Sequence, residues 1–233
     1  MVAGSARKLT TTSYAVLSLL ALRPWTTYEL AQQMKRSLHW FWPRAESNVY
    51  VEPKKLVAQG LARAERRYKG RRPSTVLKIT PAGRRALTKW VQQSGDPEPH
   101  LEFEAIVRVL AAQCVEVEDI RRLLEAVRDR MEDFVEFGEA QGAEIATTGG
   151  PFPDRTHIIA LVHGFMDIYV DAIHRWSLWA LDEVGRWRDT APDDEKITRA
   201  RQLLLTPVAE VGARAGRSTG VVSRRGETHS ERR

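Results

Sequence analysis

Five cationic side chains fall within seven consecutive positions, residues 66–72, of this 233-residue chain. Two short runs rich in strand-forming residues flank them, at about residues 61–69 and 74–80, with the turn GRRP between the runs. Like charges this close repel one another, so a hairpin of this composition makes physical sense when a polyanion lies opposite it. Phosphate binding is therefore the chemistry expected of Arg66, Arg67, Lys69, Arg71 and Arg72.

Two helix-like runs precede this hairpin at the spacing of a helix-turn-helix. Thr26 and Glu29 have the pattern of a capping box, so a helix is expected through residues 27–36. A loop rich in aromatic residues follows, and the next helix is expected over residues 45–60, where Gly60 would end it. The two runs and the hairpin together predict a winged helix-turn-helix.

Two further helices complete this part of the chain. Apolar residues recur near helical spacing over residues 9–22, and Pro24 stops the run. After the hairpin, Thr80 can cap a helix whose first residue is Pro81. The fold class predicted for residues 1–95 is therefore mainly α with a small β-hairpin, and this segment is expected to form one DNA-binding domain.

The start of the 45–60 helix carries side chains suited to a DNA groove. Short hydrogen-bonding groups suit bases or phosphates there, whereas tyrosine and lysine suit phosphates. The alternative is that these residues form only the exposed face of an ordinary helix. Together with the start of the preceding helix, the residues expected to contact DNA are Thr26, Thr27, Tyr28, Ser47, Asn48, Tyr50, Lys54 and Lys55.

Pro53 lies inside the expected 45–60 helix. It lacks the amide hydrogen that would bond Val49, and it disfavours helical backbone at Glu52. The helix is therefore expected to be kinked or to begin late, which leaves open which side chains read the bases.

Charge is divided unevenly along the chain. Residues 1–95 contain 18 Lys and Arg against 4 Asp and Glu, whereas residues 96–207 contain 12 against 23. Residues 208–233 contain 6 against 3, carry few large apolar side chains, and are expected to be disordered. Two domains can differ in charge without functional reason. A basic half that contains the hairpin nevertheless favours a nucleic-acid module joined to an acidic partner module.

Residues 101–207 are expected to form a helical dimerisation and effector domain after a linker at residues 94–100. Apolar residues keep about three heptads over residues 117–141, which suits either a packed bundle or a dimer seam. The helices are expected over residues 101–114, 117–141, 155–188 and 193–206, with a turn at 146–154. The residues expected at a dimer interface are Ile120, Leu124, Val127, Met131, Phe134, Phe165, Tyr169 and Trp176.

Tryptophans gather in two places. Trp40 and Trp42 crowd one loop, and Trp176 and Trp179 follow helical spacing. Their planar side chains could line a pocket for a small-molecule effector. The alternative is ordinary packing in the core and at a dimer interface, where tryptophan is common.

His163, Asp167, Asp171 and His174 fall on one stripe of the expected 155–188 helix. Histidine and carboxylate on one face could bind a divalent metal. The stripe also fits the solvent side of an amphipathic helix, and no third element offers a ligand motif. We therefore expect no metal site and no cofactor.

Three further features narrow the class of protein. The sequence has no Gly-rich phosphate loop, no GxSxG and no HExxH, so no enzymatic activity is expected. Its single cysteine, Cys114, excludes an internal disulfide and fits a reducing cytoplasm. The longest apolar stretches are short and interrupted by charge, so no segment is expected to span a bilayer.

Three segments resemble the PadR family of bacterial transcriptional regulators: LTTTSYAVLSLLALRPWTTYELAQQM, ESNVYVEPKKLVAQGL and RRPSTVLKITPAGRRAL. The family motifs fall at Tyr28-Glu29-Leu30, Tyr50, Thr80 and Gly83, and the similarity covers residues 9–90. The helical C-terminal half resembles the Vir-type C-terminal domain of that family.

The resemblance implies a cytoplasmic, homodimeric repressor that binds double-stranded DNA at a roughly palindromic site and is released by a small molecule or another signal. The competing hypothesis is a helical small-molecule-binding or protein-interaction module with no specific DNA target. Its basic half would meet RNA, an acidic protein or a membrane surface. A membrane role would need a basic amphipathic helix, and RNA readers expose several stacking aromatics where this hairpin has only Tyr68.

Overall fold

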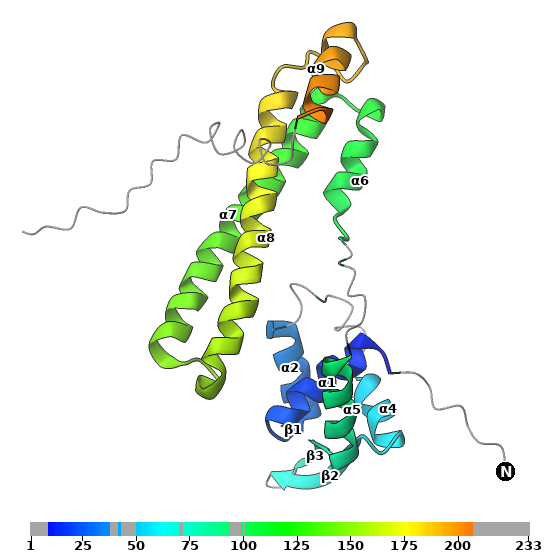
Figure 1. Cartoon of the computed structure of the whole chain (residues 1–233), viewed down its shortest axis with the longest axis vertical. Helices are drawn as coiled ribbons and strands as arrows, with labels where there is room; N and C mark the ends of the chain where they lie inside the picture. Colours follow the sequence, from blue (N-terminus) through cyan, green and yellow to red (C-terminus); the bar gives the residue numbers. More distant parts are fainter. Residues whose placement is uncertain are drawn as a thin grey trace, which may run out of the picture. The chain divides into compact units, whose positions relative to one another are not determined.

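The structure, a computed structural model, describes residues 9–37, 42, 50–69, 72–93, 99 and 101–206. For residues 69, 72 and 73 the description covers the backbone alone. The chain forms two compact units, Met1–Pro99 and His100–Arg233 (Figure 1). Each unit is described by itself below.

The first unit combines helices with a small antiparallel sheet (Figure 1). The strand order is β1-β3-β2, so β3 lies between its two partners. The prediction of mainly α structure with a β-hairpin is confirmed, and β1 adds a short third strand that the sequence did not indicate. In chain order the elements are α1 (Thr11–Leu22), β1 (Trp25–Thr26), α2 (Thr27–Ser37), α4 (Glu52–Ala58), β2 (Ala62–Lys69), β3 (Arg72–Ile79) and α5 (Pro81–Gln92).

The predicted helix caps are present in the first unit. The Thr26 hydroxyl accepts from the Glu29 amide at 3.1 Å, and the Glu29 carboxylate accepts from the Thr26 amide at 2.8 Å. Thr80 caps α5 by accepting from the Gly83 amide at 3.1 Å, with Pro81 in the first turn. These caps satisfy amides that the helices themselves leave unbonded, and so they fix where α2 and α5 begin.

The core of the first unit lies between α1, α2, α4 and the sheet. Full burial of each large aliphatic side chain contributes about 1.5–3 kcal/mol. The indole of Trp25 is also buried and donates to the Leu19 carbonyl at 2.7 Å, which fixes the turn between α1 and β1. The buried apolar residues of this core include Val16, Leu17, Leu20, Leu30, Met34, Leu56, Ala62, Val76 and Leu77.

Of the expected 45–60 helix, the structure describes residues 50–60, and residues 45–49 lie outside its description. Tyr50 and Val51 form a turn, α4 begins at Glu52, and Pro53 lies in its first turn. Proline is tolerated there because the first amides of a helix have no intrahelical partner. The turn before Glu52 agrees with the kink or late start that Pro53 suggested. Gly60, with a φ of 70°, ends the segment as expected.

The second unit is helical throughout its described part. Helices α7 and α8 pack side by side along much of their length (Figure 1). Helix α7 is longer than expected because it continues through residues 142–148, and the turn follows at Gly149 and Gly150, both with positive φ. The elements are α6 (Glu104–Leu110), η1 (Ala112–Cys114), α7 (Val117–Thr148), η2 (Pro153–Arg155), α8 (Thr156–Val184) and α9 (Asp194–Leu204).

The apolar stripe of α7 is buried within this unit. Ile120 and Leu124 pack with Ala180 and Val184 of α8, and Trp176 and Trp179 cover the cluster. Val127 and Met131 form a second cluster with Ala105 of α6. Of the two interpretations of the heptads, the structure therefore corresponds to the packed bundle.

A carboxylate holds α9 against α8. Glu183 is buried, and both of its oxygens accept from the Arg199 guanidinium, at 2.6 and 3.2 Å. Lys196 adds contacts to Asp189 at 3.0 Å and to Asp193 at 2.7 Å. These contacts fix the described C-terminal helix on the end of the α7–α8 pair.

One helix of the second unit corrects an expectation. By length and composition, the segment Pro153–Val184 could cross a bilayer, because it contains a window of residues that is apolar enough on average. Uninterrupted apolar runs in the sequence do not reveal this segment, because only the average over a long stretch of the helix is apolar enough. Core helices of other proteins pass the same test, so it is weak evidence for a membrane span. None of the window is buried within this chain.

Candidate nucleic-acid interface

The wing consists of β2 and β3, paired antiparallel from Ala62 opposite Ile79 to Lys69 opposite Arg72. Arg66 lies opposite Thr75, and Arg67 lies opposite Ser74. Both arginine side chains are exposed, and among the described residues neither has an ion-pair partner. Two cations that point into solvent without a counter-charge are well suited to phosphate. Arg71, and the side chains of Lys69 and Arg72, lie outside the described residues.

At the base of the wing the cations are paired. Glu65 accepts from Lys78 at 2.7 Å and lies 3.3 Å from the Nε of Arg63. The hydrogen bond from Lys78, followed by the charges of Lys78, Arg63 and Arg67, holds the pKa of Glu65 below its usual value. This group was not expected from the sequence, because a count of cations contains no information on the strand register. The register places Arg63 directly opposite Lys78, so the three side chains share one face.

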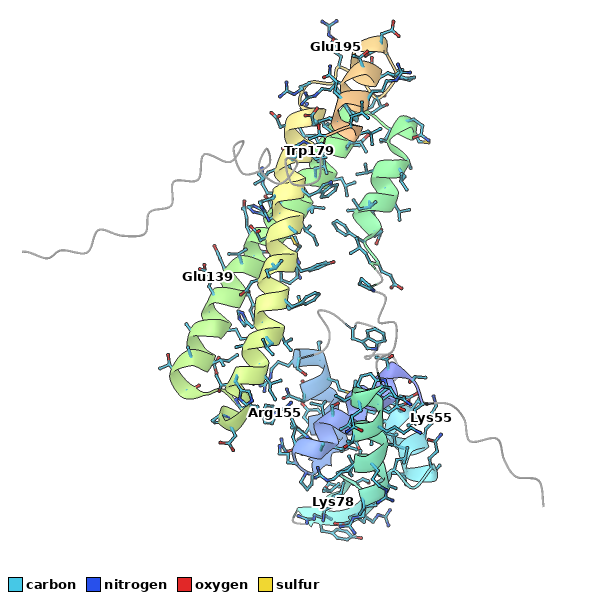
Figure 2. All side chains as sticks on the ribbon, viewed as in Figure 1. Lys55, Lys78, Glu139, Arg155, Trp179 and Glu195 are labelled. Atoms are coloured by element: carbon cyan, nitrogen blue, oxygen red, sulfur yellow. The ribbon has the colours of Figure 1, made fainter. Side chains whose placement is uncertain are left out.

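Helix α4 and the turn before it present two of the expected DNA-contacting residues to solvent. Lys54 is exposed, and Tyr50, one residue before the N-cap, has 57% of its surface exposed. Lys55 differs, because its ammonium is 2.6 Å from the Glu52 carboxylate and is only partly exposed (Figure 2). Ser47 and Asn48 lie outside the described residues.

Glu52 is a buried carboxylate that ties α4 to α1. Its Oε2 accepts from the Ser13 hydroxyl at 2.6 Å, and its Oε1 accepts from Lys55. Burial raises the pKa of Glu52, but the hydrogen bonds from Lys55 and Ser13 and the charge of Lys55 outweigh it, so the pKa lies below its usual value. The orientation of the helix that would read DNA therefore depends on an ionised carboxylate.

Glu52→Gln is expected to lower the free energy of unfolding by about 1–3 kcal/mol at neutral pH, because it weakens buried hydrogen bonds. A depressed pKa in the folded state contributes stability above the unfolded value of about 4.5, and this contribution disappears as the pH falls through the folded value. The difference between wild type and variant should therefore shrink below pH 4.5. Urea unfolding of both proteins at several pH values from 7 to 3 measures this difference in the free energy of unfolding. A difference that stays constant over this range would contradict the assigned role.

The start of α2 lies beside the sheet. Strand β1 pairs with the central strand β3, with Thr26 opposite Val76, so α2 begins directly after an edge strand of the sheet. Thr26 is engaged in the cap, Thr27 is partly exposed, and Tyr28 has 69% of its surface exposed. Of these three residues, Tyr28 is the most available for contact with a phosphate.

The tryptophans of the expected effector pocket belong to different units. In the first unit, Trp42 donates from its indole to the Thr12 hydroxyl at 3.1 Å. In the second unit, Trp176 and Trp179 cover the α7–α8 core, and Trp176 meets Phe103 edge to face, with the ring centroids 5.9 Å apart. Trp40 lies outside the described residues. The effector pocket remains a prediction.

The residues expected at a dimer interface have different surroundings. Ile120, Leu124, Val127 and Met131 are buried within one chain and are not available to a partner in this conformation. Phe134 lies under the Arg130 guanidinium, which is 4.5 Å from the ring centroid, and Trp176 packs into the core. Phe165 is exposed over 59% of its surface and stacks on Tyr169, whose pKa is raised by burial.

The polar stripe of α8 is divided among separate partners. His163 contacts Asp167 at 3.0 Å and the Gly138 carbonyl of α7 at 3.1 Å. His174 contacts Glu132 of α7 at 3.4 Å, and Asp171 pairs with Arg175. In the described part of the chain, no three such side chains form a group that could hold a metal ion. The stripe joins α8 to α7 in this structure.

Comparison with known proteins gives a family match within the first unit. The family model described as the transcriptional regulator PadR-like family matches residues 16–89. No match was found among the curated proteins.

Several solved structures share the fold over most of the chain. PadR from Bacillus subtilis in complex with operator DNA has a TM-score of 0.63 at 19% identity, covering 75% of this chain and 99% of that one. PadR from the same organism in complex with p-coumaric acid has a TM-score of 0.58 at 19% identity, covering 76% and 100%. The Vibrio cholerae virulence activator AphA has a TM-score of 0.56 at 23% identity, covering 75% and 98%.

Proposed function

We propose that this chain, whose residues 16–89 match the PadR-like family of transcriptional regulators, belongs to that family and binds specific double-stranded DNA in the cytoplasm. The winged-helix unit would make the contacts with DNA. Helix α4 would enter the major groove, and the wing would lie along the phosphate backbone or the minor groove. The residues proposed to contact DNA are those named from the sequence, with Tyr28, Tyr50, Lys54, Arg66 and Arg67 the exposed members among the described side chains.

One observation carries this proposal: a β-hairpin beside a helix-turn-helix directs into solvent two arginines that have no ion-pair partner among the described side chains. A hairpin with a purely structural role gains nothing from Arg66 and Arg67 in this state, because exposed like charges repel. A solved structure with the same fold is described as a complex with operator DNA, which supports the same role for this unit.

We propose further that the second unit forms a homodimer through α8. An exposed apolar stripe follows helical spacing along this helix, and apolar stripes of this kind mark interaction surfaces. A dimer would present two recognition helices to a roughly palindromic site, about one helical turn apart. The stripe consists of Ile158, Leu161, Val162, Phe165 and Ile168.

Regulation would follow from the population of dimer geometries. A small molecule that binds one geometry more tightly than the other shifts the protein away from the form that holds DNA, which would make it a repressor released by an effector. A structural neighbour is described as a complex with p-coumaric acid, and this supports a small planar effector as the signal.

Selection of bound duplexes from a random pool tests the proposed function. A sequence-specific regulator is expected to enrich a palindromic motif, and its selected duplex should compete far better than random duplex or RNA of equal length. Equal competition by all three nucleic acids would remove the case for specific DNA recognition and favour the interaction-module alternative.

Leu161→Glu combined with Ile168→Glu is expected to convert the dimer into monomers. These side chains are 76% and 71% exposed in the single chain, so the unit should still fold with the two glutamates. In the dimer the same positions would be buried against the partner, where unpaired carboxylates are strongly unfavourable. Sedimentation velocity at micromolar concentration measures the mass. Val91→Glu, a 70% exposed position of the first unit, serves as the matched control and should stay dimeric. A wild type that sediments as a monomer would refute the proposed dimer.

A further inference from the structure

The wing carries its own counter-charge at its base. Glu65 contacts Lys78 at 2.7 Å across the strand pair and Arg63 at 3.3 Å on its own strand. Lys78 is 22% exposed and Glu65 is 34% exposed, so this cluster lies at the surface rather than in the core. The ion pairs are therefore not needed to compensate a buried charge. Their position next to Arg66 and Arg67 suggests a functional role for Glu65.

The arrangement divides the cations of the wing into two classes. Toward the turn, Arg66 and Arg67 have no acidic partner among the described side chains. At the base, Arg63 and Lys78 share one carboxylate, and the hydrogen bond from Lys78 holds the pKa of Glu65 below its usual value. Only unpaired cations release counterions when they meet a phosphate, because a cation that must first leave a carboxylate gains little from the exchange.

We propose that Glu65 limits the phosphate contacts of the wing by occupying Lys78 and Arg63, and so restrains sequence-independent binding to DNA. This inference rests on the proposed DNA-binding function. Sequence-independent affinity is mainly electrostatic, and a genome offers a large excess of non-specific sites. When fewer cations are available to phosphates, less of the regulator is bound to non-specific DNA and more of it is free to bind its operator. A single carboxylate in the wing has this effect and leaves Arg66 and Arg67 available.

Glu65→Gln tests the inference, because glutamine keeps the shape and removes the charge. The full-length variant should bind a random duplex more tightly, with a salt slope steeper by about 0.9 for each cation released, or by about 1.8 for both. Between 50 and 200 mM salt, each added contact makes the loss of affinity about 3.5-fold larger. Fluorescence anisotropy with a labelled random duplex over this range measures both quantities.

Two variants separate this effect from a general change of net charge. Glu139→Gln removes one exposed carboxylate from α7 in the second unit, and it should leave the slope unchanged (Figure 2). Glu65→Gln combined with Lys78→Gln should lower the slope again by about 0.9, because Lys78 is then no longer available to phosphate. Glu65→Ala repeats the test with another side chain, and far-UV circular dichroism checks that each variant is folded.

The outcomes are distinguishable. A steeper slope for Glu65→Gln alone, lowered again by the added Lys78→Gln, supports the inference. If the wild type binds duplex with the usual salt dependence while Glu65→Gln and Glu65→Ala match it, or Glu139→Gln has the same effect as Glu65→Gln, the inference is overturned and the proposed function stands. A wild type that binds no duplex at low salt overturns the proposed function and this inference together.

Discussion

Replacement of Arg66 and Arg67 together by alanine is expected to weaken binding to every duplex alike, by about 30-fold at 0.15 M salt. The physical reason is counterion release: each arginine that neutralises a phosphate contributes about 0.9 to the salt slope, so two lost contacts lower the slope by about 1.8. Both side chains are exposed and unpaired among the described residues, so their removal should cost little stability. Anisotropy titrations of a selected duplex and a random duplex measure the slopes.

The second unit offers a matched control for the arginine pair. Arg121 and Arg122 are also adjacent, and each pairs with an acidic residue one helical turn away, Glu118 and Asp119. Their joint replacement by alanine removes the same net charge and should leave the slope for DNA unchanged. Equal losses for the two double variants would show that net charge, rather than the wing, governs binding. A loss confined to the selected duplex would show base reading instead of phosphate contact.

The parts of the fold that the sequence predicted well depend on local chemistry. A capping hydroxyl with a carboxylate three residues later acts within one helical turn, so Thr26 and Glu29 determine the start of α2 without tertiary information. Gly60 and Pro81 act through their own backbone preferences in the same way. The hairpin is local too, because its strands are joined by a short turn.

Structural features that depend on residues far away in the sequence could not be predicted, or were left undecided, from the sequence alone. Strand β1 has two residues, and it exists only because β3 offers its free edge to Trp25 and Thr26. The heptad pattern of α7 indicated an apolar face but not the element that packs against it. In the structure, α8 and α6 of the same chain pack against this face. Hydrophobic periodicity measures the need for burial, and a dimer seam and a bundle satisfy that need equally.

In the candidate nucleic-acid interface, too, local features were predictable from the sequence and tertiary contacts were not. The charge of residues 66–72 was visible from the sequence, but the pairing of Lys78 with Glu65 required the strand register. Lys55 was expected to meet phosphate, whereas Glu52 holds its ammonium in this structure. A count of cations treats them all as equal, although the nearest carboxylate decides which of them are available.

Gly83→Ala is expected to destabilise the first unit by about 3 kcal/mol and to lower its melting temperature by about 15 °C. A Cβ on Gly83 would lie 2.1 Å from the Leu61 carbonyl oxygen and 2.9 Å from Cγ1 of Ile79. The first neighbour is backbone and cannot rotate away, so α5 would have to move off the sheet. This movement would break the Thr80 bonds to the backbone of Gly60 and Leu61, at 2.7 and 3.1 Å.

Gly138→Ala separates this clash from the effect of helix propensity. Gly138 lies inside α7, where a Cβ would meet only Asp167 Oδ1 at 3.7 Å, an ordinary contact. Alanine is favoured over glycine in a helix by about 0.5–1 kcal/mol, so this variant should be slightly more stable than the wild type. Calorimetry on the full-length protein measures both variants. If Gly83→Ala also raised the melting temperature, α5 could not lie against the start of β2 as described, and the wing would lose the helix that supports its base.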